Sequence, residues 1–293
     1  MASNSQLEAS FARCRRIAKT RARNFYYSFL LLPRAEKDAM CAVYAFMRFA
    51  DDLSDDPDPP PETRERALEQ WRQALEKAIA GDVSADPIMP ALAATIERYK
   101  IPPDYFFELM KGVTSDVDPG RYRTFDDLYQ YCYRVASVVG MTIIHIFGFD
   151  RPEALKLAEK CGIGFQLTNI LRDIPEDAGR ERVYLPEEDL EQFGLRGKDL
   201  NGATAFKDLM RFQWDRADSY YREAAPLLEM VHPANRPALW AMMSIYHGVL
   251  ERIREQEFDV YSKRPRLSAL EKSLIVVKAA RGRWLGGSLP FPA

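Results

Sequence analysis

Acidic residues crowd together directly after the apolar run 39–50. Asp51 and Asp55 are four residues apart, so on a helix their carboxylates share one face at a spacing of about 6 Å. Like charges at this distance repel, and the C-terminal end of a helix is already partly negative. A bound cation would relieve both effects, so the cluster is a candidate metal site. The alternative is a solvated acidic helix end that runs into the proline-rich segment 57–61.

A second oxygen-rich cluster consists of Asn169, Asp173 and Asp177, which follow one another at intervals of four residues. On a helix they line one face over two turns. Oxygen ligands without His or Cys select hard cations, and Mg²⁺ held by few carboxylates takes its remaining oxygens from water and substrate phosphates. The cluster therefore predicts a magnesium site for a phosphorylated substrate. A polar stripe on a surface helix is the alternative, which the apolar residues around the cluster disfavour.

Each acidic cluster has an arginine beside it, Arg48 in the first and Arg172 in the second. Helical bundles build metal sites in their interior from side chains on facing helices. Two such helices facing one another could clamp several Mg²⁺ ions on a diphosphate. The pattern thus favours chemistry on a diphosphate substrate.

The elements that must carry these clusters have helical patterns. The segment 65–79 places apolar residues at three- and four-residue steps with charges between them, and Thr124 with Asp127 resembles a capping box. The run 135–149 is rich in β-branched residues but is too long for a typical strand, so we interpret it as a buried core helix.

Prolines mark where helices end or bend. The cluster at 57–61 requires that a helix end before it, and Pro175 predicts a kink or local opening inside the second acidic cluster. The other breaks are spread too evenly to mark a linker between domains. We expect an all-α chain of about ten helices in a single domain, 1–293.

Length and composition exclude several classes of protein. The chain has 293 residues, with 41 Lys and Arg against 43 Asp and Glu, so a formal net charge of −2 gives no global reason to bind nucleic acid. Its four cysteines show no CxxC spacing, which indicates a reducing cytoplasm rather than disulfides or zinc. No secretory signal and no membrane-spanning apolar run is evident. We expect a cytoplasmic protein, with a peripheral contact at the inner face of the membrane left open.

Five segments, in order along the chain, resemble the motifs of the squalene/phytoene synthase family of head-to-head prenyltransferases. They read RNFYYSFLLLP (23–33), YAFMRFADDLSD (44–55), YCYRVASVVG (131–140), QLTNILRDIPED (166–177) and RVYLP (182–186). The similarity spans most of the chain. Five ordered motifs are a far more specific signal than either cluster of aspartates alone.

The resemblance implies an isoprenoid synthase fold, a single large helical bundle with a central catalytic cavity. Asp51 and Asp55 match the first aspartate-rich motif of the family, and Asn169, Asp173 and Asp177 match the second. In the family both motifs bind Mg²⁺ and diphosphate. Members ionise one prenyl diphosphate, join its allylic cation to the double bond of a second, and close a cyclopropyl diphosphate such as presqualene diphosphate. This chemistry needs a strongly neutralised leaving group and a water-free apolar pocket for the cation.

Further residues acquire roles through the same resemblance. Arg48, Arg172 and Arg23 are expected to neutralise the leaving diphosphate. Tyr131 matches a family tyrosine near the reacting carbons, for positioning or for proton removal with the help of diphosphate, and a buried core tyrosine is its alternative. Tyr246 matches another tyrosine on the diphosphate side. The remaining expected substrate-binding residues are Arg23, Asp52, Val135, Ala136, Val139, Gln166, Arg182, Tyr184 and Lys263.

Two of these expectations leave alternatives open. Arg180, Arg182 and Tyr184 belong either to a flap over the metals or to a solvated basic loop. Lys263 and Arg264 both stand near the place where a diphosphate-binding base is expected, and the register between them is loose.

We predict the Mg²⁺-dependent condensation of two farnesyl diphosphates to presqualene diphosphate, in a bacterial hopanoid or squalene route. The preference for farnesyl diphosphate rests on the resemblance of the N-terminal motif and of 131–136. A phytoene synthase that joins two geranylgeranyl diphosphates is the alternative within the family. Whether the reaction continues to squalene with NADPH stays open, because no GxGxxG fingerprint is present and family members that use NADPH lack one too.

Two alternatives from other classes are a non-catalytic helical scaffold that has kept the fold and a terpene cyclase or head-to-tail prenyltransferase. A decayed site would have lost some metal ligands, whereas all five are present here. The acidic motifs also differ from the DDxxD usage of the cyclases. Both alternatives therefore rank below the head-to-head enzyme.

Overall fold

The computed structural model describes residues 3–22, 25–118, 120–198, 200–202 and 204–285. These residues form fourteen α-helices and one π-helical turn, η1, and no β-strand. Phe149 and Val231 make an isolated β-bridge. The prediction of an all-α chain is confirmed.

In chain order the elements are α1 (Asn4–Arg21), α2 (Phe25–Phe29), α3 (Arg34–Asp55), α4 (Pro61–Ile79), α5 (Met89–Tyr99), α6 (Asp104–Ser115), α7 (Phe125–Cys132), η1 (Tyr133–Ser137), α8 (Val138–Phe147), α9 (Glu153–Gly179), α10 (Glu187–Gln192), α11 (Phe206–Ala224), α12 (Leu227–Met230), α13 (Arg236–Glu255) and α14 (Ala269–Leu285). The described helices outnumber the ten or so that the sequence predicted. Short helices account for part of the difference, since α10 and α12 each begin directly after a proline, Pro186 and Pro226.

The predicted helix ends agree with the structure. α3 ends at Asp55 and α4 begins at Pro61, so the proline cluster separates two helices. Thr124 and Asp127 form the predicted capping box: the Asp127 amide donates to Thr124 Oγ1 at 3.2 Å, and the Thr124 amide donates to Asp127 Oδ2 at 2.9 Å.

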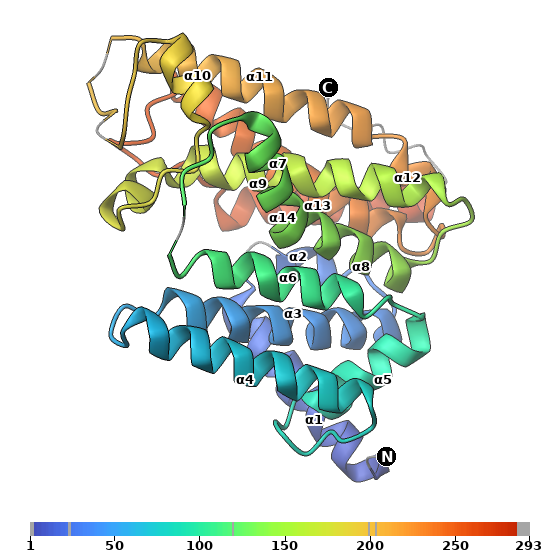
Figure 1. Cartoon of the computed structure of the whole chain (residues 1–293). Helices are drawn as coiled ribbons and strands as arrows, with labels where there is room; N and C mark the ends of the chain where they lie inside the picture. The colour runs from blue at the N-terminus through green and yellow to red at the C-terminus, as the bar shows by residue number, and fades with distance from the viewer. Residues whose placement is uncertain (1–2, 23–24, 119, 199, 203, 286–293) are drawn as a thin grey trace.

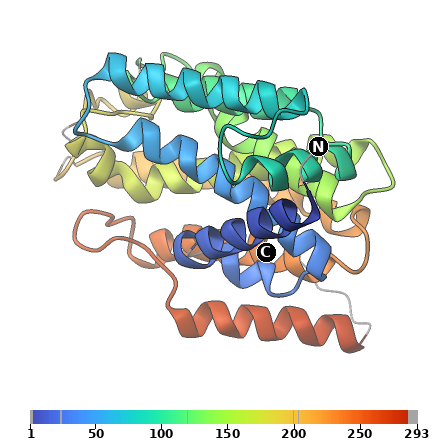
Figure 2. The same ribbon diagram turned by 90° about the horizontal axis from the view of Figure 1, so that it is seen from below.

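α9 runs through the middle of the molecule, with α8, η1, α11 and α13 packed against it (Figure 1). The N-terminal helices α1, α3, α4, α5 and α6 form the lower part of the same view. α14 packs against α13 and α2 along one side of the molecule (Figure 2). The C-terminal ends of α3 and α9, which carry the two acidic clusters, both lie at the left of Figure 1.

α9 is buried over most of its length because apolar residues occupy most of its circumference. We expected a kink or an opening at Pro175, but the segment stays helical from Glu153 to Gly179. Pro175 has no N–H group to donate to the carbonyl of Leu171. Leu171 and Ile174 are nevertheless both buried, and they hold the helix in the core. Asp173 and Asp177 therefore keep a common face.

Two glycines allow α9 to approach its neighbours closely. A Cβ atom on Gly162 of α9 would lie 2.6 Å from the carbonyl oxygen of Ala136 in η1. A Cβ atom on Gly140 of α8 would lie 2.7 Å from the carbonyl oxygen of Ala158 in α9. Both distances are shorter than van der Waals contact, so only glycine permits this packing.

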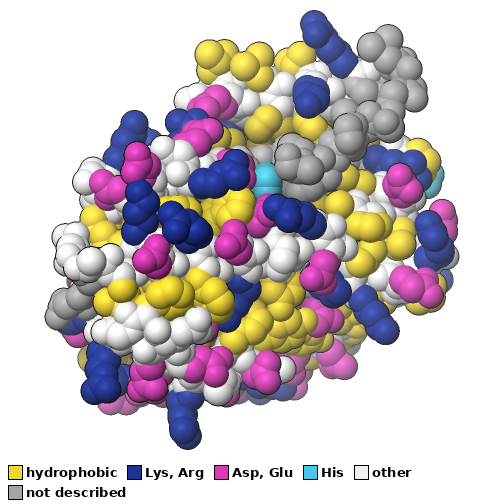
Figure 3. All heavy atoms as spheres, turned by 90° about the horizontal axis from the view of Figure 1, so that it is seen from above, with side chains coloured by type: hydrophobic (Ala, Val, Ile, Leu, Met, Phe, Trp, Pro, Cys, Tyr) yellow, Lys and Arg dark blue, Asp and Glu magenta, His cyan; other side chains and the backbone are white. Residues whose placement is uncertain are grey.

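The described surface carries charges of both signs. On the face seen from above in Figure 3, basic and acidic side chains are interspersed rather than gathered by sign. In its described part, α14 exposes the apolar side chains of Leu270, Leu274 and Val277. Among the described helices, none combines the length and the apolar character needed to cross a membrane.

Candidate active site

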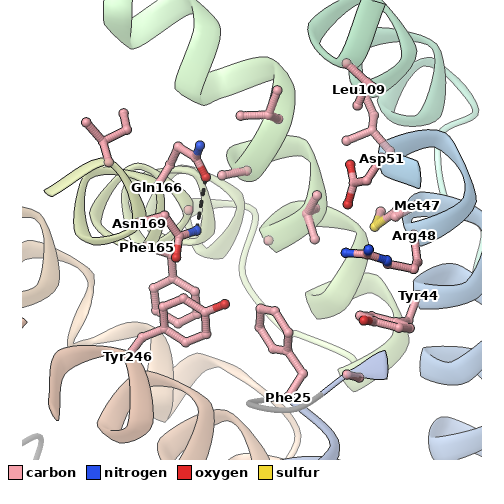
Figure 4. Close-up of a pocket in the computed structure, with 18 of the residues that line it drawn as sticks. Phe25, Tyr44, Met47, Arg48, Asp51, Leu109, Phe165, Gln166, Asn169 and Tyr246 are labelled. Carbon is pink, nitrogen blue, oxygen red and sulfur yellow. Dashed lines mark hydrogen bonds between the residues drawn. The ribbon is translucent and has the colours of Figure 1, made fainter. Parts of the chain in front are cut away.

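A cavity of about 570 Å³ lies between α3, α6, η1, α8, α9 and α13. Figure 4 shows its two walls: Tyr44, Arg48 and Asp51 project from α3, and Gln166 and Asn169 face them from α9. Each helix presents one stripe to the cavity. On α3 the stripe runs through Met40, Val43, Tyr44, Met47, Arg48, Asp51 and Asp55. These steps of three and four residues are those of one helix face.

The cavity changes from apolar to charged along its length. On α3 the lining begins with Met40 and Val43 and ends with Asp51 and Asp55. On α9 it begins with Ala158 and Cys161 and ends with the second acidic cluster. α13 follows the same order, from Leu239 and Met242 to Tyr246. One end of the cavity therefore suits a hydrocarbon chain and the other suits a polar, charged group.

Arginines neutralise the first acidic cluster in this structure. Arg182 donates to Asp55 Oδ1 at 3.0 Å, and Arg180 lies 3.2 Å from the same oxygen. Arg48 donates to Asp52, which does not itself line the cavity. The Arg48 Nε atom is buried without a hydrogen-bond partner among the described residues, so part of this guanidinium is unpaired.

The second acidic cluster is held in the same way. Arg172 donates to both oxygens of Asp173, at 2.9 and 2.5 Å. Arg264, from the segment before α14, donates to Asp173 Oδ1 at 2.7 Å and lies 2.9 Å from Glu176. Arg180 contacts Glu176 at 3.6 Å as well as Asp55, so one guanidinium joins the first cluster to an acid that lies beside the second.

Two carboxylates at the charged end, those of Asp51 and Asp177, have raised pKa values. Desolvation raises the pKa of Asp51 to about 7; the charge of Arg48 opposes this, while the charges of Asp55 and Asp116 act in the same direction as desolvation. Desolvation likewise raises the pKa of Asp177 to about 7, with Asp173 adding to the effect. A bound cation would favour the ionised form of both carboxylates.

Tyr131, in α7, lines the cavity and contacts residues from the segments that follow α6 and α9. Its hydroxyl donates to Asp116 Oδ2 at 3.0 Å, and the Tyr184 hydroxyl donates to Asp116 Oδ1 at 2.8 Å. The Tyr131 and Tyr184 rings stack at a centroid distance of 5.1 Å. Burial raises the pKa of both phenols far above the ordinary value, so both keep their protons.

Aromatic rings form the middle of the cavity. Tyr246 stacks face to face on Phe165, with centroids 4.2 Å apart and an interplanar angle of 3°, and Phe25 lies 5.0 Å from Tyr246 (Figure 4). Ring faces carry partial negative charge and attract cations. This part of the cavity can therefore stabilise a positive charge while it excludes water.

The structure brings most of the predicted site residues to this one cavity. They are Arg48, Asp51, Asp55, Tyr131, Val135, Ala136, Val139, Gln166, Asn169, Arg172, Asp173, Asp177, Arg182, Tyr184 and Tyr246. The π-helical turn contributes two adjacent residues of the wall, Val135 and Ala136. Such turns recur at functional sites.

Two predicted site residues, Asp52 and Lys263, do not line the cavity. Arg23 falls outside the described residues. Asp52 lies beside the cavity, paired with Arg48 and 3.6 Å from Arg21. Lys263 does not line the cavity, whereas its neighbour Arg264 does, so Arg264 is the candidate for the diphosphate-binding base.

Sequence reasoning missed two acidic residues that line the cavity, Asp116 and Glu176. Glu176 lies inside the second motif and could have been included on its spacing. Asp116 follows the last residue of α6 in a segment without any recognisable motif, so no signal in the sequence distinguishes it.

A model of the squalene/phytoene synthase family matches residues 18–271 of the chain. The chain belongs to this family. Its members are prenyltransferases that join two prenyl diphosphates head to head, and the charged and apolar ends of the cavity suit the two parts of such a substrate. The family assignment and the isoprenoid synthase fold predicted from the motifs are confirmed.

Two relatives within the squalene/phytoene synthase family are named for phytoene synthesis. The chain is 36% identical over 276 residues to a 15-cis-phytoene synthase of Synechococcus elongatus, covering 89% of each chain. It is 36% identical over 281 residues to a phytoene synthase of Mycobacterium tuberculosis, covering 94% of this chain and 92% of the relative.

Solved structures of the same fold carry other names. A dehydrosqualene synthase in complex with a ligand superposes with a TM-score of 0.86 at 29% identity, covering 96% of this chain and 98% of that one. A squalene synthase from Alicyclobacillus acidocaldarius superposes with a TM-score of 0.80 at 29% identity, covering 87% of this chain and 97% of that one. The family resemblance alone thus leaves the prenyl chain length unresolved.

Squalene/phytoene synthases generally use a divalent metal, and the donor set of this chain fits Mg²⁺. Asp51, Asp55, Asp173 and Asp177 supply carboxylate oxygens, the ligands that this hard cation prefers. Asn169 Oδ1 is buried without a hydrogen-bond donor among the described residues, although its amide nitrogen donates to Gln166. An unpaired buried acceptor in the middle of the second motif is a position that a cation or its water would satisfy.

Another cluster with ligand-type side chains lies outside the cavity, at Asp218, His247 and Glu251. Arginines already pair with its acids, since Arg222 contacts Asp218 and Arg254 contacts Glu251. His247 Nε2 lies 2.8 Å from Asp218 Oδ1. These contacts satisfy the cluster as an internal network that joins α11 to α13.

Proposed function

We propose that this enzyme condenses two molecules of farnesyl diphosphate head to head to presqualene diphosphate. The observation that supports this most is the polarity of the cavity, which has acidic clusters of α3 and α9 with six arginines at one end and apolar residues of α3, α8 and α13 at the other. A diphosphate with a long hydrocarbon tail has this same division.

Loss of diphosphate is the first demand on the site. Arg48, Arg172 and Arg264 lie where a diphosphate at the acidic clusters would be, and their charges stabilise the leaving group. Mg²⁺, when bound at the two motifs, adds Lewis-acid neutralisation of the diphosphate oxygens. Arg48 and Arg264 can reorient from their carboxylates to the diphosphate, because a guanidinium binds phosphate and carboxylate with the same fork of donors.

The allylic cation is the second demand. Phe25, Phe165 and Tyr246 line the middle of the cavity, where aromatic rings stabilise a cation and help to exclude the water that would capture it. The double bond of the second substrate then attacks the cation, and loss of one proton closes the cyclopropane ring. Tyr131, at the cavity wall, is the residue that we assign to this last step.

The choice of farnesyl diphosphate is supported by two solved structures named for dehydrosqualene and squalene synthesis, which superpose over most of this chain. Phytoene synthesis from geranylgeranyl diphosphate is the second candidate, favoured by the 36% identity to phytoene synthases. The resemblance of the motifs at 23–33 and 131–136 favours the first. A hopanoid or squalene route in the cytoplasm, with a peripheral membrane contact for the lipid product, remains the expected setting.

The proposal is tested by incubating the purified protein with Mg²⁺ and each diphosphate separately, with and without NADPH, followed by mass analysis of diphosphates and neutral lipids. We expect a cyclopropyl diphosphate from farnesyl diphosphate. Squalene formed only with NADPH would extend the reaction by a reductive step. Phytoene from geranylgeranyl diphosphate alone would contradict the proposed substrate, and no turnover of either substrate would favour the non-catalytic scaffold.

A further inference from the structure

Asp116 is the half-buried carboxylate on which two tyrosines of the cavity converge. It follows α6 directly, and each of its carboxylate oxygens accepts one phenolic proton, from Tyr131 at 3.0 Å and from Tyr184 at 2.8 Å. Arg182 donates to the backbone carbonyl of Asp116 at 2.7 Å rather than to its carboxylate. The residue is thus fixed at both its main chain and its side chain.

The rings around Asp116 cannot easily turn. Tyr131 stacks on Tyr184 at 5.1 Å, and Tyr122 lies 5.5 Å from Tyr131 and 5.9 Å from Tyr184. Tyr131 and Tyr184 are both buried. Packing therefore sets the positions of both phenol oxygens, independently of any substrate.

The hydrogen bond that Tyr131 donates determines whether its hydroxyl can donate or accept a proton on the cavity side. A phenol has one proton and two acceptor lone pairs. Tyr131 donates its proton to Asp116, so its oxygen offers only lone pairs to a group in the cavity. In this arrangement Tyr131 can accept a proton or face a cation, but it cannot donate a hydrogen bond to the diphosphate.

We propose that Asp116 positions Tyr131 and receives its proton, so that the two residues form a relay for the deprotonation that closes the cyclopropane ring. The inference rests on the proposed function. The C–H bond of the substrate breaks, and its electron pair forms the closing C–C bond. The substrate proton passes to Tyr131 Oη while the proton of Tyr131 passes to the carboxylate of Asp116, which becomes a carboxylic acid and returns the proton to solvent after product release.

The surroundings of Asp116 suit an acceptor that works near neutral pH. Burial raises the pKa of Asp116 to about 6, while the hydrogen bonds from Tyr184 and Tyr131 act in the opposite direction. The carboxylate is therefore ionised at neutral pH, yet it binds a proton more tightly than an ordinary aspartate does. Tyr184 holds the second oxygen and keeps the first aimed at Tyr131.

A second tyrosine of α7 provides a matched control for the pair of Tyr131 and Asp116. Tyr129, two residues before Tyr131 in α7, donates to Glu159 at 2.5 Å, which makes the same phenol-to-carboxylate pair. Neither Tyr129 nor Glu159 lines the cavity. Glu159→Gln therefore measures the structural cost of neutralising such a pair without touching the relay.

The experiment compares Asp116→Asn, Tyr131→Phe, the double variant and Glu159→Gln. An asparagine at 116 keeps the size of the side chain and one acceptor oxygen, but it cannot take a proton from Tyr131. We expect Asp116→Asn to lower kcat about 10²-fold or more with KM and the Mg²⁺ half-saturation unchanged, and to raise the yield of free diphosphate and prenyl alcohol relative to cyclopropyl product. The double variant should be no slower than either single variant, since both interrupt one relay, and Glu159→Gln should match wild type.

Several outcomes would overturn the relay. Wild-type rate and product ratio in Asp116→Asn would remove Asp116 from the step, and multiplying effects in the double variant would show that the two residues act separately. A shifted Mg²⁺ half-saturation with loss of ionisation would instead make Asp116 a metal ligand. If the wild-type enzyme uses geranylgeranyl diphosphate, the proposed substrate is wrong, but the relay can still be tested with that substrate because its ring closure also releases one proton. If the enzyme turns over neither substrate, both the proposed function and the relay are overturned.

Discussion

Arg182, in the loop after α9, donates a hydrogen bond of 3.0 Å to Asp55 at the end of α3. The contact joins two segments that are 127 residues apart and closes one side of the charged end of the cavity. Arg264 makes the equivalent contact with Asp173 from the segment before α14. Both acidic clusters are thus neutralised by guanidinium groups, which can turn to a diphosphate when cations take over the carboxylates.

Removing one carboxylate of either cluster should abolish turnover without unfolding the protein. We expect Asp51→Asn or Asp173→Asn to lower kcat/KM by about 10²-fold or more, because each change weakens neutralisation of the leaving diphosphate. Asp58→Asn, an exposed acid in the loop after α3, should leave the rate unchanged. Steady-state kinetics and thermal melts of the three variants check this, and near-normal rates in both cluster variants would contradict the proposed site.

The stabilisation of the protein by Mg²⁺ should grow with pH. The pKa values of Asp51 and Asp177 are about 7 in the fold and about 4 in the unfolded chain, so the fold binds protons more tightly. Their contribution to stability is fully present below about pH 4 and is lost as the pH rises to about 7, where both become charged. We expect Mg²⁺ to raise Tm more at about pH 8 than at about pH 5.5. Differential scanning fluorimetry measures this, and an equal rise at both pH values would count against these ligands.

Arg264 and Lys263 form a matched pair for testing the arginines. Arg264 lines the cavity and contacts Asp173, whereas the neighbouring Lys263 does not line it. Arg264→Gln should lower kcat/KM about tenfold or more, since a charge-assisted contact to diphosphate is lost. Lys263→Gln should match wild type. The reverse order of the two effects would show that the lysine serves as the diphosphate-binding base.

Gly162 should be far less tolerant of a methyl group than Gly179 on the same helix. A Cβ atom at 162 meets the carbonyl of Ala136 at 2.6 Å, whereas nothing lies within 4 Å of one at 179. Gly162→Ala should lower the free energy of unfolding by about 1–3 kcal/mol, the usual cost of overpacking. Denaturant melts compare the two variants, and equal stabilities would mean that η1 can move away from α9.

The sequence predicted the parts of this site that lie within single helices. The spacing of Asp51 and Asp55, and of Asn169, Asp173 and Asp177, is local and follows from helical periodicity alone. The predicted opening at Pro175 was wrong, because the burial of Leu171 and Ile174 outweighs the loss of one backbone hydrogen bond.

What the sequence could not predict depends on contacts between distant elements. Asp116 becomes important only because α7 and the loop after α9 bring Tyr131 and Tyr184 to its two oxygens. The choice of Arg264 over Lys263 depends on how the segment before α14 crosses the end of α9. Neither relation leaves a periodic or motif signal in one chain.

A competition assay tests the central claim most directly. Wild-type enzyme with Mg²⁺ and equal amounts of farnesyl and geranylgeranyl diphosphate is sampled at low conversion, and the products are identified by mass. The product ratio then reports the ratio of the two kcat/KM values. We predict that presqualene diphosphate dominates; a predominance of phytoene or of its cyclopropyl precursor would contradict the account.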